Sequence, residues 1–152
     1  MKKILVFAVV TLFSISVFAE TVFEYNGVYY KKTSSTTACV IANPDGTKYS
    51  GDIVIAVTPQ RGVFTTAIAD SAFFKCTELT SIDLPTSIAV IGKESFRDCR
   101  LLKSIKLPNI TNVPYDAFCG CKELESVDIS NVTTIDEFAF YSCSSLKSIN
   151  IP

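Results

Sequence analysis

The chain contains no histidine and no tryptophan, and its only methionine is Met1. Without histidine it cannot supply a Ser–His–Asp triad, a Cys–His pair, a histidine general base or a histidine-containing zinc site. The net charge is also small: 14 Lys and Arg and 15 Asp and Glu give a net charge of −1 over 152 residues. Nucleic-acid-binding proteins normally carry a basic excess, so the sequence predicts no nucleic-acid partner.

The longest hydrophobic run lies at the N-terminus. Two lysines precede an almost wholly apolar stretch over residues 4–13, and Val-Phe-Ala at residues 17–19 resembles a cleavage site. This order is typical of a secretory signal peptide. We therefore predict a signal peptide at residues 1–19, cleaved after Ala19, and a secreted or cell-surface protein. An uncleaved N-terminal anchor is the alternative. No other stretch is long enough for an integral membrane span.

The rest of the chain contains an internal repeat. A phenylalanine followed three residues later by a cysteine recurs four times, at offsets of 23, 22 and 22 residues. A leucine follows each cysteine by three residues, and two further apolar positions follow that leucine by three and five residues. The recurring pairs are Phe73/Cys76, Phe96/Cys99, Phe118/Cys121 and Phe140/Cys143. Such a period predicts a solenoid, whose units bury their apolar faces only by stacking.

The unit I-x-x-x-A-F-x-x-C-x-x-L-x-S-I-x-L-P resembles the BspA-like subclass of leucine-rich repeats, found mainly in bacterial and some protozoan cell-surface proteins. Residues 68–85 (IADSAFFKCTELTSIDLP) and 135–152 (IDEFAFYSCSSLKSINIP) match it closely. Residues 91–108 have serine in place of the small alanine, and residues 113–130 lack the closing proline. The resemblance begins near residue 49. It implies adhesion to host matrix proteins and to other cells.

Each unit is expected to contribute one short strand and one helical turn. In the L-x-x-I-x-L segment the last two apolar residues alternate with polar ones, which predicts a strand with one buried face. Such strands, stacked about 4.8 Å apart, build a parallel sheet. The A-F-x-x-C segment is expected to be helical, because acidic residues near its start favour a helix N-terminus. The predicted fold is an α/β solenoid, a leucine-rich-repeat array with parallel strands and short helical turns, preceded by an N-terminal β cap.

The four predicted repeats cover residues 68–90, 91–112, 113–134 and 135–152. Before them, residues 20–67 have the pattern of β structure, and Asn26-Gly27 between two β-rich runs predicts a hairpin. We expect this segment to cap the first repeat, because terminal units of a solenoid must cover an apolar side. The alternative is an exposed recognition patch formed by Tyr25, Tyr29 and Tyr30. At least one of these tyrosines should pack inward, because they alternate across a strand.

Four of the six cysteines form one column of the repeat, and Cys39 and Cys119 lie off it. Small thiols that recur at one packing position are expected to be buried and reduced. A column spaced by 22 residues is a line, whereas a zinc site needs converging ligands, so we predict no metal and no cofactor. Disulfides along the column, and one between Cys39 and Cys119, are the alternatives.

The polar residues between the buried strand positions form a candidate binding face: Ser81, Asp83, Ser104, Lys106, Ser126, Asp128, Ser148 and Asn150. In an aligned stack, Asp83, Lys106 and Asp128 alternate in sign. One interpretation is cross-strand charge pairing, with about 0.2–1 kcal/mol contributed by each pair. The other is a polar ligand-binding surface, because solenoids commonly bind on an extended face.

No catalytic residue is predicted. Asp83 and Asp128 would lie two repeats apart with Lys106 between them, which keeps both ionised and leaves no general acid. We therefore expect a non-catalytic secreted or cell-surface protein that binds a protein or another cell-surface ligand. The alternatives are a structural spacer, or fragment of a longer surface protein, and an extracellular hydrolase. Because no cap follows the last repeat in the sequence, self-association at that repeat is a further expectation.

Overall fold

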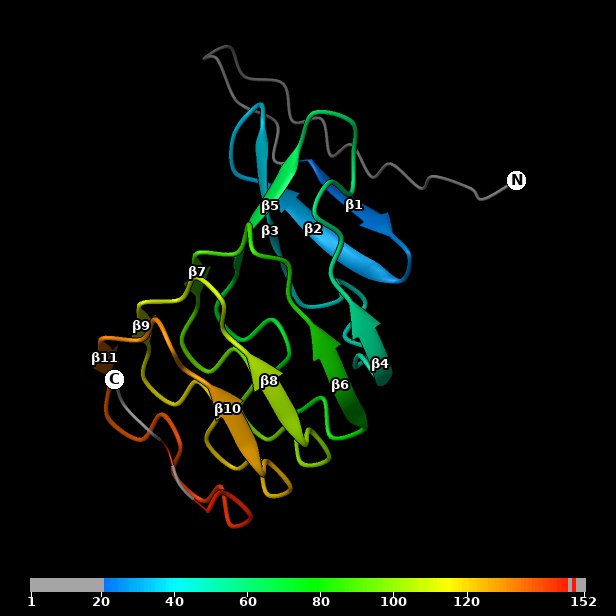
Figure 1. Cartoon of the computed structure of the whole chain (residues 1–152). Coiled ribbons are helices and arrows are strands. Elements are labelled where there is room, and N and C mark those ends of the chain that lie inside the picture. The colour runs from blue at the N-terminus through cyan, green and yellow to red at the C-terminus, as the bar shows by residue number, and fades with distance from the viewer. Residues whose placement is uncertain (1–20, 148, 150–152) are drawn as a thin grey trace.

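The computed structural model describes residues 21–147 and 149, and these residues form strands and turns without a helix. The predicted signal peptide and two candidate face residues, Ser148 and Asn150, lie outside the described residues. Two rows of short strands run along the molecule and enclose its core together with the turns that connect them (Figure 1). None of the described residues belongs to a helix that could cross a membrane.

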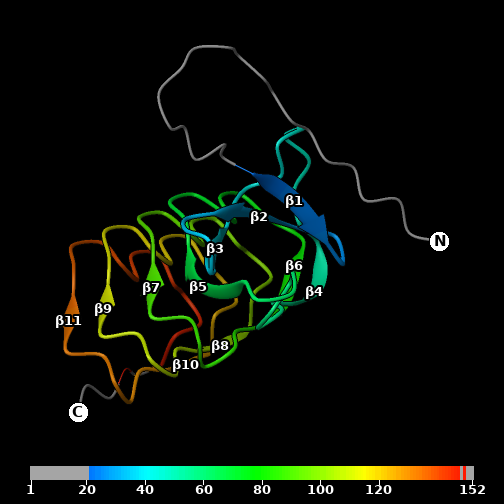
Figure 2. The ribbon, with the colours of Figure 1, turned by 90° about the horizontal axis from the view of Figure 1, so that it is seen from above.

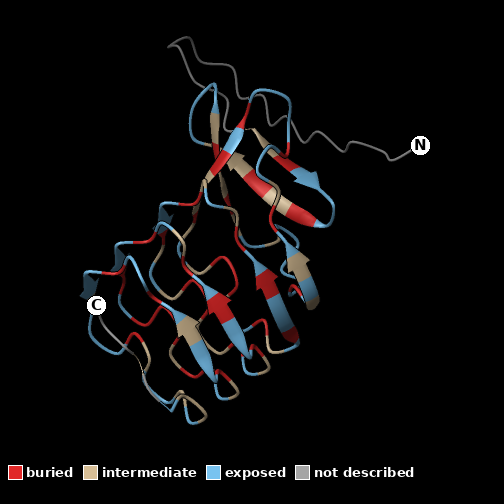
Figure 3. Cartoon of the chain, in the orientation of Figure 1, coloured by how far each residue is buried: buried red, intermediate tan, exposed pale blue. Residues whose placement is uncertain are grey.

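The first row contains β4 (Gly51–Val54), β6 (Leu79–Asp83), β8 (Ser104–Lys106) and β10 (Ser126–Asp128). β4 pairs in parallel with β6, β8 pairs in parallel with β10, and β6 contacts β8. The register places Ile53 opposite Ile82 and Val127 opposite Ile105. These apolar residues pack against the core and alternate with exposed polar residues (Figure 3). The predicted parallel strands with one buried face are thus confirmed.

The second row contains β5 (Phe64–Ile68), β7 (Val90–Ile91), β9 (Asn112–Val113) and β11 (Thr134–Ile135). β5 pairs in parallel with β7 and β9 pairs in parallel with β11, and Figure 2 shows β7, β9 and β11 side by side. The apolar residue that opens each predicted repeat is the last residue of its strand. Each of the first three repeats therefore has two strands where one is predicted, because a strand of two residues is too short to show a period in the sequence.

The predicted hairpin is formed by β1 (Val22–Tyr25) and β2 (Val28–Lys32). Asn26 and Gly27 at its tip have φ values of 51° and 79°, and a type I′ turn requires positive φ at both positions. β2 pairs with β3 (Thr37–Val40), which pairs in parallel with β5, so these strands continue the second row. Tyr30 is fully buried, which confirms that at least one tyrosine packs inward.

Tyr49 connects the segment before the repeats to the core of the first one. Its ring centroid lies 5.0 Å from that of Phe73, and its side chain is buried. The tyrosine thus covers the first phenylalanine of the repeated column. This contact favours a capping role for residues 20–67, and the cap itself stays a prediction.

The A-F-x-x-C segments form consecutive turns where a helical turn is predicted. We call residues 69–78, 92–101, 114–123 and 136–145 the turn segments. Each has two positive-φ positions, occupied in chain order by Ser71 and Lys75, Glu94 and Asp98, Asp116 and Gly120, and Phe138 and Ser142. Alternate backbone N–H groups close local turns. In the first three segments the N–H groups between them donate to the next repeat, as from Phe96 to Ala117 O at 2.8 Å. A helix directs its N–H groups along its own axis and cannot form these bonds, so the acidic residues meet no helix N-terminus.

A stack of phenylalanine rings runs through the turn segments. Successive centroids from Phe73 through Phe96 and Phe118 to Phe140 are 5.1, 5.2 and 5.3 Å apart, with ring planes within 5° of parallel. The first three side chains are fully buried. Aromatic pairs contribute about 0.5–1.5 kcal/mol beyond the area that they bury, so the stack stabilises each junction between repeats.

The column cysteines are free thiols, and three of them, Cys76, Cys99 and Cys121, are buried. The thiol of Cys99 donates to the carbonyl of Phe73 at 3.1 Å, and that of Cys121 donates to the carbonyl of Phe96 at 3.0 Å. Each thiol therefore bonds to the preceding repeat, which a small apolar residue cannot do. Cys39 and Cys119 are half-buried free thiols, and the described residues hold no cluster of three metal-ligating side chains.

Burial of the column thiols predicts alkaline destabilisation. It raises the pKa of Cys143 from 9.0 to about 11 and also raises the pKa of Cys99 and Cys121. A thiol with a higher pKa in the folded state stabilises the fold fully below pH 9, and this contribution is lost as the pH rises toward the folded value. We expect the urea midpoint to decrease as the pH is raised from about 8 to about 10. Cys121→Ala should make this decrease with pH smaller. A midpoint independent of pH over this range contradicts the prediction.

Candidate binding face

The structure brings six of the eight predicted face residues onto one surface. Two of them come from each of the strands β6, β8 and β10, and all are exposed: Ser81, Asp83, Ser104, Lys106, Ser126 and Asp128. The register of β8 and β10 places Ser104 beside Ser126 and Lys106 beside Asp128. We call this surface, formed by the exposed side of β4, β6, β8 and β10, the strand face.

The predicted charge ladder on the strand face does not close into ion pairs. Within the described residues, Lys106 makes no ion pair with Asp83 or Asp128. Asp128 accepts hydrogen bonds from the hydroxyl of Ser130 at 2.5 Å and from its backbone N–H at 3.2 Å. These bonds, with a smaller effect from Lys106, hold the pKa of Asp128 below its usual range. A general acid needs a raised pKa, so Asp128 lacks the property that the hydrolase alternative requires.

Asp52 on β4 extends the strand face by one strand. Its carboxylate accepts hydrogen bonds from the hydroxyls of Ser81 at 2.6 Å and Thr80 at 2.8 Å, which lower its pKa. Asp52 is not among the predicted face residues, because β4 precedes the first recognised repeat. The alternation Ile53-x-Ile55 is the signal that could have found it, since the buried pair Ile82-x-Leu84 of the first repeat has the same spacing.

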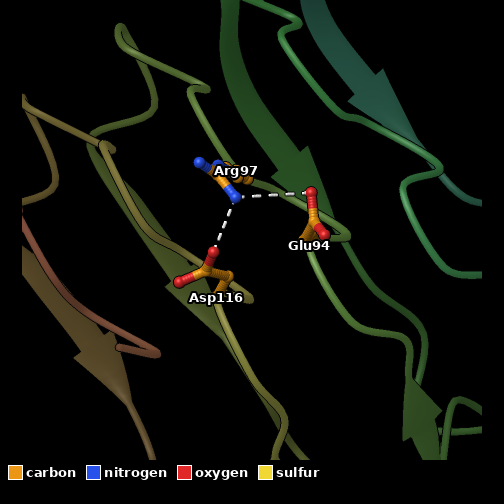
Figure 4. A network of polar contacts seen from close by, with 3 residues as sticks. All are labelled: Glu94, Arg97 and Asp116. Atoms are coloured by element: carbon orange, nitrogen blue, oxygen red, sulfur yellow. Dashed lines mark hydrogen bonds and ion pairs between the residues drawn. The ribbon is translucent and has the colours of Figure 1, made fainter. Parts of the chain in front are cut away.

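A second polar cluster links two turn segments. Nη1 of Arg97 lies 2.6 Å from Oδ2 of Asp116 and 3.5 Å from Oε2 of Glu94 (Figure 4). Asp116 is only 5% exposed, whereas the side chain of Arg97 is 37% exposed. A buried carboxylate needs a charged or hydrogen-bonding partner. Arg97 supplies that partner from the preceding repeat, which gives this cluster a structural role.

Removing Arg97 should therefore destabilise the fold. We expect Arg97→Met to lower the free energy of unfolding by about 2 kcal/mol, less than for a fully buried pair because the guanidinium is partly solvated. Arg100→Met is the matched control: its pair with Asp98 is 3.8 Å long and Arg100 is 54% exposed, so about 0–1 kcal/mol is expected. Urea denaturation followed by circular dichroism measures both. Equal losses would show that Asp116 does not depend on Arg97.

The architecture defines a class of protein. Units of 22 or 23 residues stack in parallel register, columns of leucine, isoleucine and phenylalanine fill the core, and short strands present polar residues outward. These are the features of a leucine-rich repeat protein. A family model for the BspA type leucine-rich repeat region matches residues 66–152 in six copies. The match covers more than half of the chain, so the chain belongs to this family, as the repeat unit predicts.

Solved structures share the fold. A leucine-rich cell surface protein from Faecalibacterium prausnitzii has 30% identity and a TM-score of 0.71, over 84% of this chain and 32% of the other. A leucine-rich repeat protein from Bacteroides ovatus has 20% identity and a TM-score of 0.64, over 82% of this chain and 40% of the other. A third, from Eubacterium ventriosum, has 21% identity and a TM-score of 0.54, over 90% and 47%. The chain thus spans less than half the length of each. No curated protein matches it.

Proposed function

We propose that the chain is a non-catalytic secreted or cell-surface binding module whose strand face takes a protein or another cell-surface ligand. Membership of the BspA-type family and the likeness to a bacterial cell surface protein support the location. The signal-peptide pattern of residues 1–19 supports export. Adhesion to host matrix proteins or to other cells is the role that these points favour.

The observation that carries the proposal is the set of exposed charges of both signs on the strand face that form no ion pairs among the described residues. Lys106 lies beside Asp128 in register, yet among the described residues neither side chain is used in an ion pair. On each strand the outward residue two positions before the charge is a serine, whose short side chain cannot cover it. A surface that offers both signs in fixed positions favours a partner with the complementary pattern, through specificity and association rate.

Binding to immobilised matrix proteins and to intact cells tests the proposal. For any partner that the unmodified protein binds, Lys106→Ser and Asp83→Ser should each weaken binding by about tenfold, equivalent to about 1.4 kcal/mol. Arg61→Ser removes an exposed charge in the turn before β5 and should leave binding unchanged. Unaltered binding of both face variants would exclude the strand face as the site. Failure of the protein to bind any immobilised partner would favour the structural-spacer alternative.

Self-association through the last repeat stays a prediction. Phe140 and Ile149 of that repeat are partly buried against the core, so both retain apolar surface. Sedimentation equilibrium of the purified protein over a wide concentration range measures the effect. A monomer at the highest concentration would contradict it.

A further inference from the structure

Three exposed aromatic side chains gather on the third and fourth turn segments. Tyr115, Phe138 and Tyr141 are 39%, 53% and 63% exposed. The ring of Phe138 lies 5.9 Å from each of the other two, with interplanar angles of 89° and 86°. Such edge-to-face contacts are a preferred aromatic geometry and hold the rings in a defined arrangement. We call these three residues the aromatic cluster.

The aromatic cluster faces sideways from the stack of repeats. The turn segment of the fourth repeat packs beside that of the third, where Asp116 N–H donates to Glu137 O at 3.3 Å and Gly120 N–H to Tyr141 O at 2.8 Å. Tyr115 keeps its exposure although this neighbour is in place. Tyr115 therefore lies on the side of the array, where Phe138 contacts its ring, and all three residues belong to turn segments outside the strands of the strand face.

Phe138 occupies a backbone conformation that phenylalanine rarely adopts. Its φ is 57°, in the left-handed region, where a side chain costs about 1–2 kcal/mol. Ser71, Glu94 and Asp116 hold the equivalent positions in the other repeats. Its ring is only half buried, so the contacts that offset this strain are mainly those with Tyr115 and Tyr141. The strained position is therefore tied to the aromatic cluster, and strained residues concentrate at functional sites.

In the first repeat, a ring on this side of the array lies beside two lysines of the same chain. Phe74 occupies the position equivalent to Tyr141, and the Nζ atoms of Lys75 and Lys48 lie 5.1 and 5.9 Å from its ring centroid. These distances are those of cation–π contacts. In the described part of the chain, no lysine or arginine lies over a ring of the aromatic cluster. Arg97, in the same column, is held by Asp116 and Glu94.

The charges beside the cluster favour a cation as well. Asp136 and Glu137 immediately precede Phe138, and both are exposed. Carboxylates and the faces of aromatic rings both present a negative potential, so together they attract an ammonium or guanidinium group. We propose that the aromatic cluster docks a lysine- or arginine-bearing segment of a partner protein. The cation lies over Phe138 or Tyr141, and Asp136 and Glu137 accept its N–H groups.

Fluorescence anisotropy with a labelled peptide of three Gly-Ser-Arg units tests this proposal on the full chain. The unmodified protein should bind it, and a peptide with citrulline, a neutral analogue, in place of arginine should bind at least tenfold more weakly. Phe138→Gly removes the ring and also relieves the left-handed strain. We expect it to weaken binding at least tenfold while the thermal midpoint changes little, because the relieved strain offsets the lost ring contacts.

The controls separate this surface from any other exposed ring or charge. Phe64 on β5 is 48% exposed and lies outside the cluster, so Phe64→Ser should leave peptide binding unchanged. Asp83→Ser removes a carboxylate that could attract the peptide to the strand face, so unchanged peptide binding in this variant distinguishes the aromatic cluster from the strand face. The proposal is overturned if the arginine peptide does not bind, if citrulline binds equally well, or if Phe138→Gly binds as the unmodified protein does.

Discussion

Replacing Phe96 by alanine is expected to lower the free energy of unfolding by about 3–5 kcal/mol. Phe96 is fully buried and lies between Phe73 and Phe118, with centroids 5.1 and 5.2 Å away. The substitution opens a cavity in the middle of the stack and removes two ring contacts, each worth about 0.5–1.5 kcal/mol. The loss should lie near the upper end of the range, because the parallel rings on both sides cannot close the gap without shifting a repeat.

Urea denaturation followed by circular dichroism measures this loss, with Phe64→Ala as the control because its ring is half exposed on β5. Each repeat contacts only its neighbours, so damage at one junction should also reduce cooperativity and broaden the transition. Phe96→Leu should fall between the control and the alanine variant. A loss below about 1 kcal/mol for Phe96→Ala would mean that the stack is not a main source of stability.

The apolar core is the part of this fold that the sequence predicts best. The recurrence of Phe96, Leu102, Ile105 and Leu107 at fixed spacings identifies them as inward residues, and all four are buried. Repetition makes the prediction strong, because the same environment is sampled once in each unit. The Asn-Gly hairpin is equally predictable, since its turn depends on two adjacent residues.

The turn segments could not be predicted, because their conformation depends on the neighbouring repeat. A phenylalanine and a cysteine three residues apart fit one helical turn and also fit consecutive turns. The backbone bonds between repeats, such as that from Phe73 N–H to Ser95 O, favour the second arrangement. Glu94 and Asp98 adopt positive φ to form it, and neither residue marks such a position in a sequence as glycine does.

The two candidate surfaces differ in the same way. Asp83, Lys106 and Asp128 could be placed on one face because strand alternation and a constant repeat suffice to align them. Tyr115 and Phe138 belong to different columns of the repeat and come together only when two turn segments stack. Their contact depends on the lateral offset between repeats, which a period does not specify.

The approach of the first two repeats leaves no room for a Cβ at Gly92, and Gly92→Ala is expected to lower the free energy of unfolding by about 3 kcal/mol. A Cβ at this position would lie 2.6 Å from the carbonyl carbon of Ala69, and closer still to the backbone nitrogen and Oδ1 of Asp70. Two of these atoms are backbone, so they can move only if the first two repeats separate. Separation would also lengthen the hydrogen bond of 2.8 Å from Lys93 N–H to Asp70 Oδ1.

The equivalent position in the fourth repeat provides the matched control. Asp136 is exposed there, so Asp136→Ala should change the free energy of unfolding by less than about 0.5 kcal/mol. Asp70→Ala combined with Gly92→Ala removes the carboxylate but leaves the backbone contacts, so it should recover little stability. Full recovery of stability in this double variant would show that the added Cβ clashes with the side chain of Asp70 and not with the backbone. Because the backbone of Ala69 and Asp70 sets the limit, we expect the approach of the two repeats to require glycine at this position.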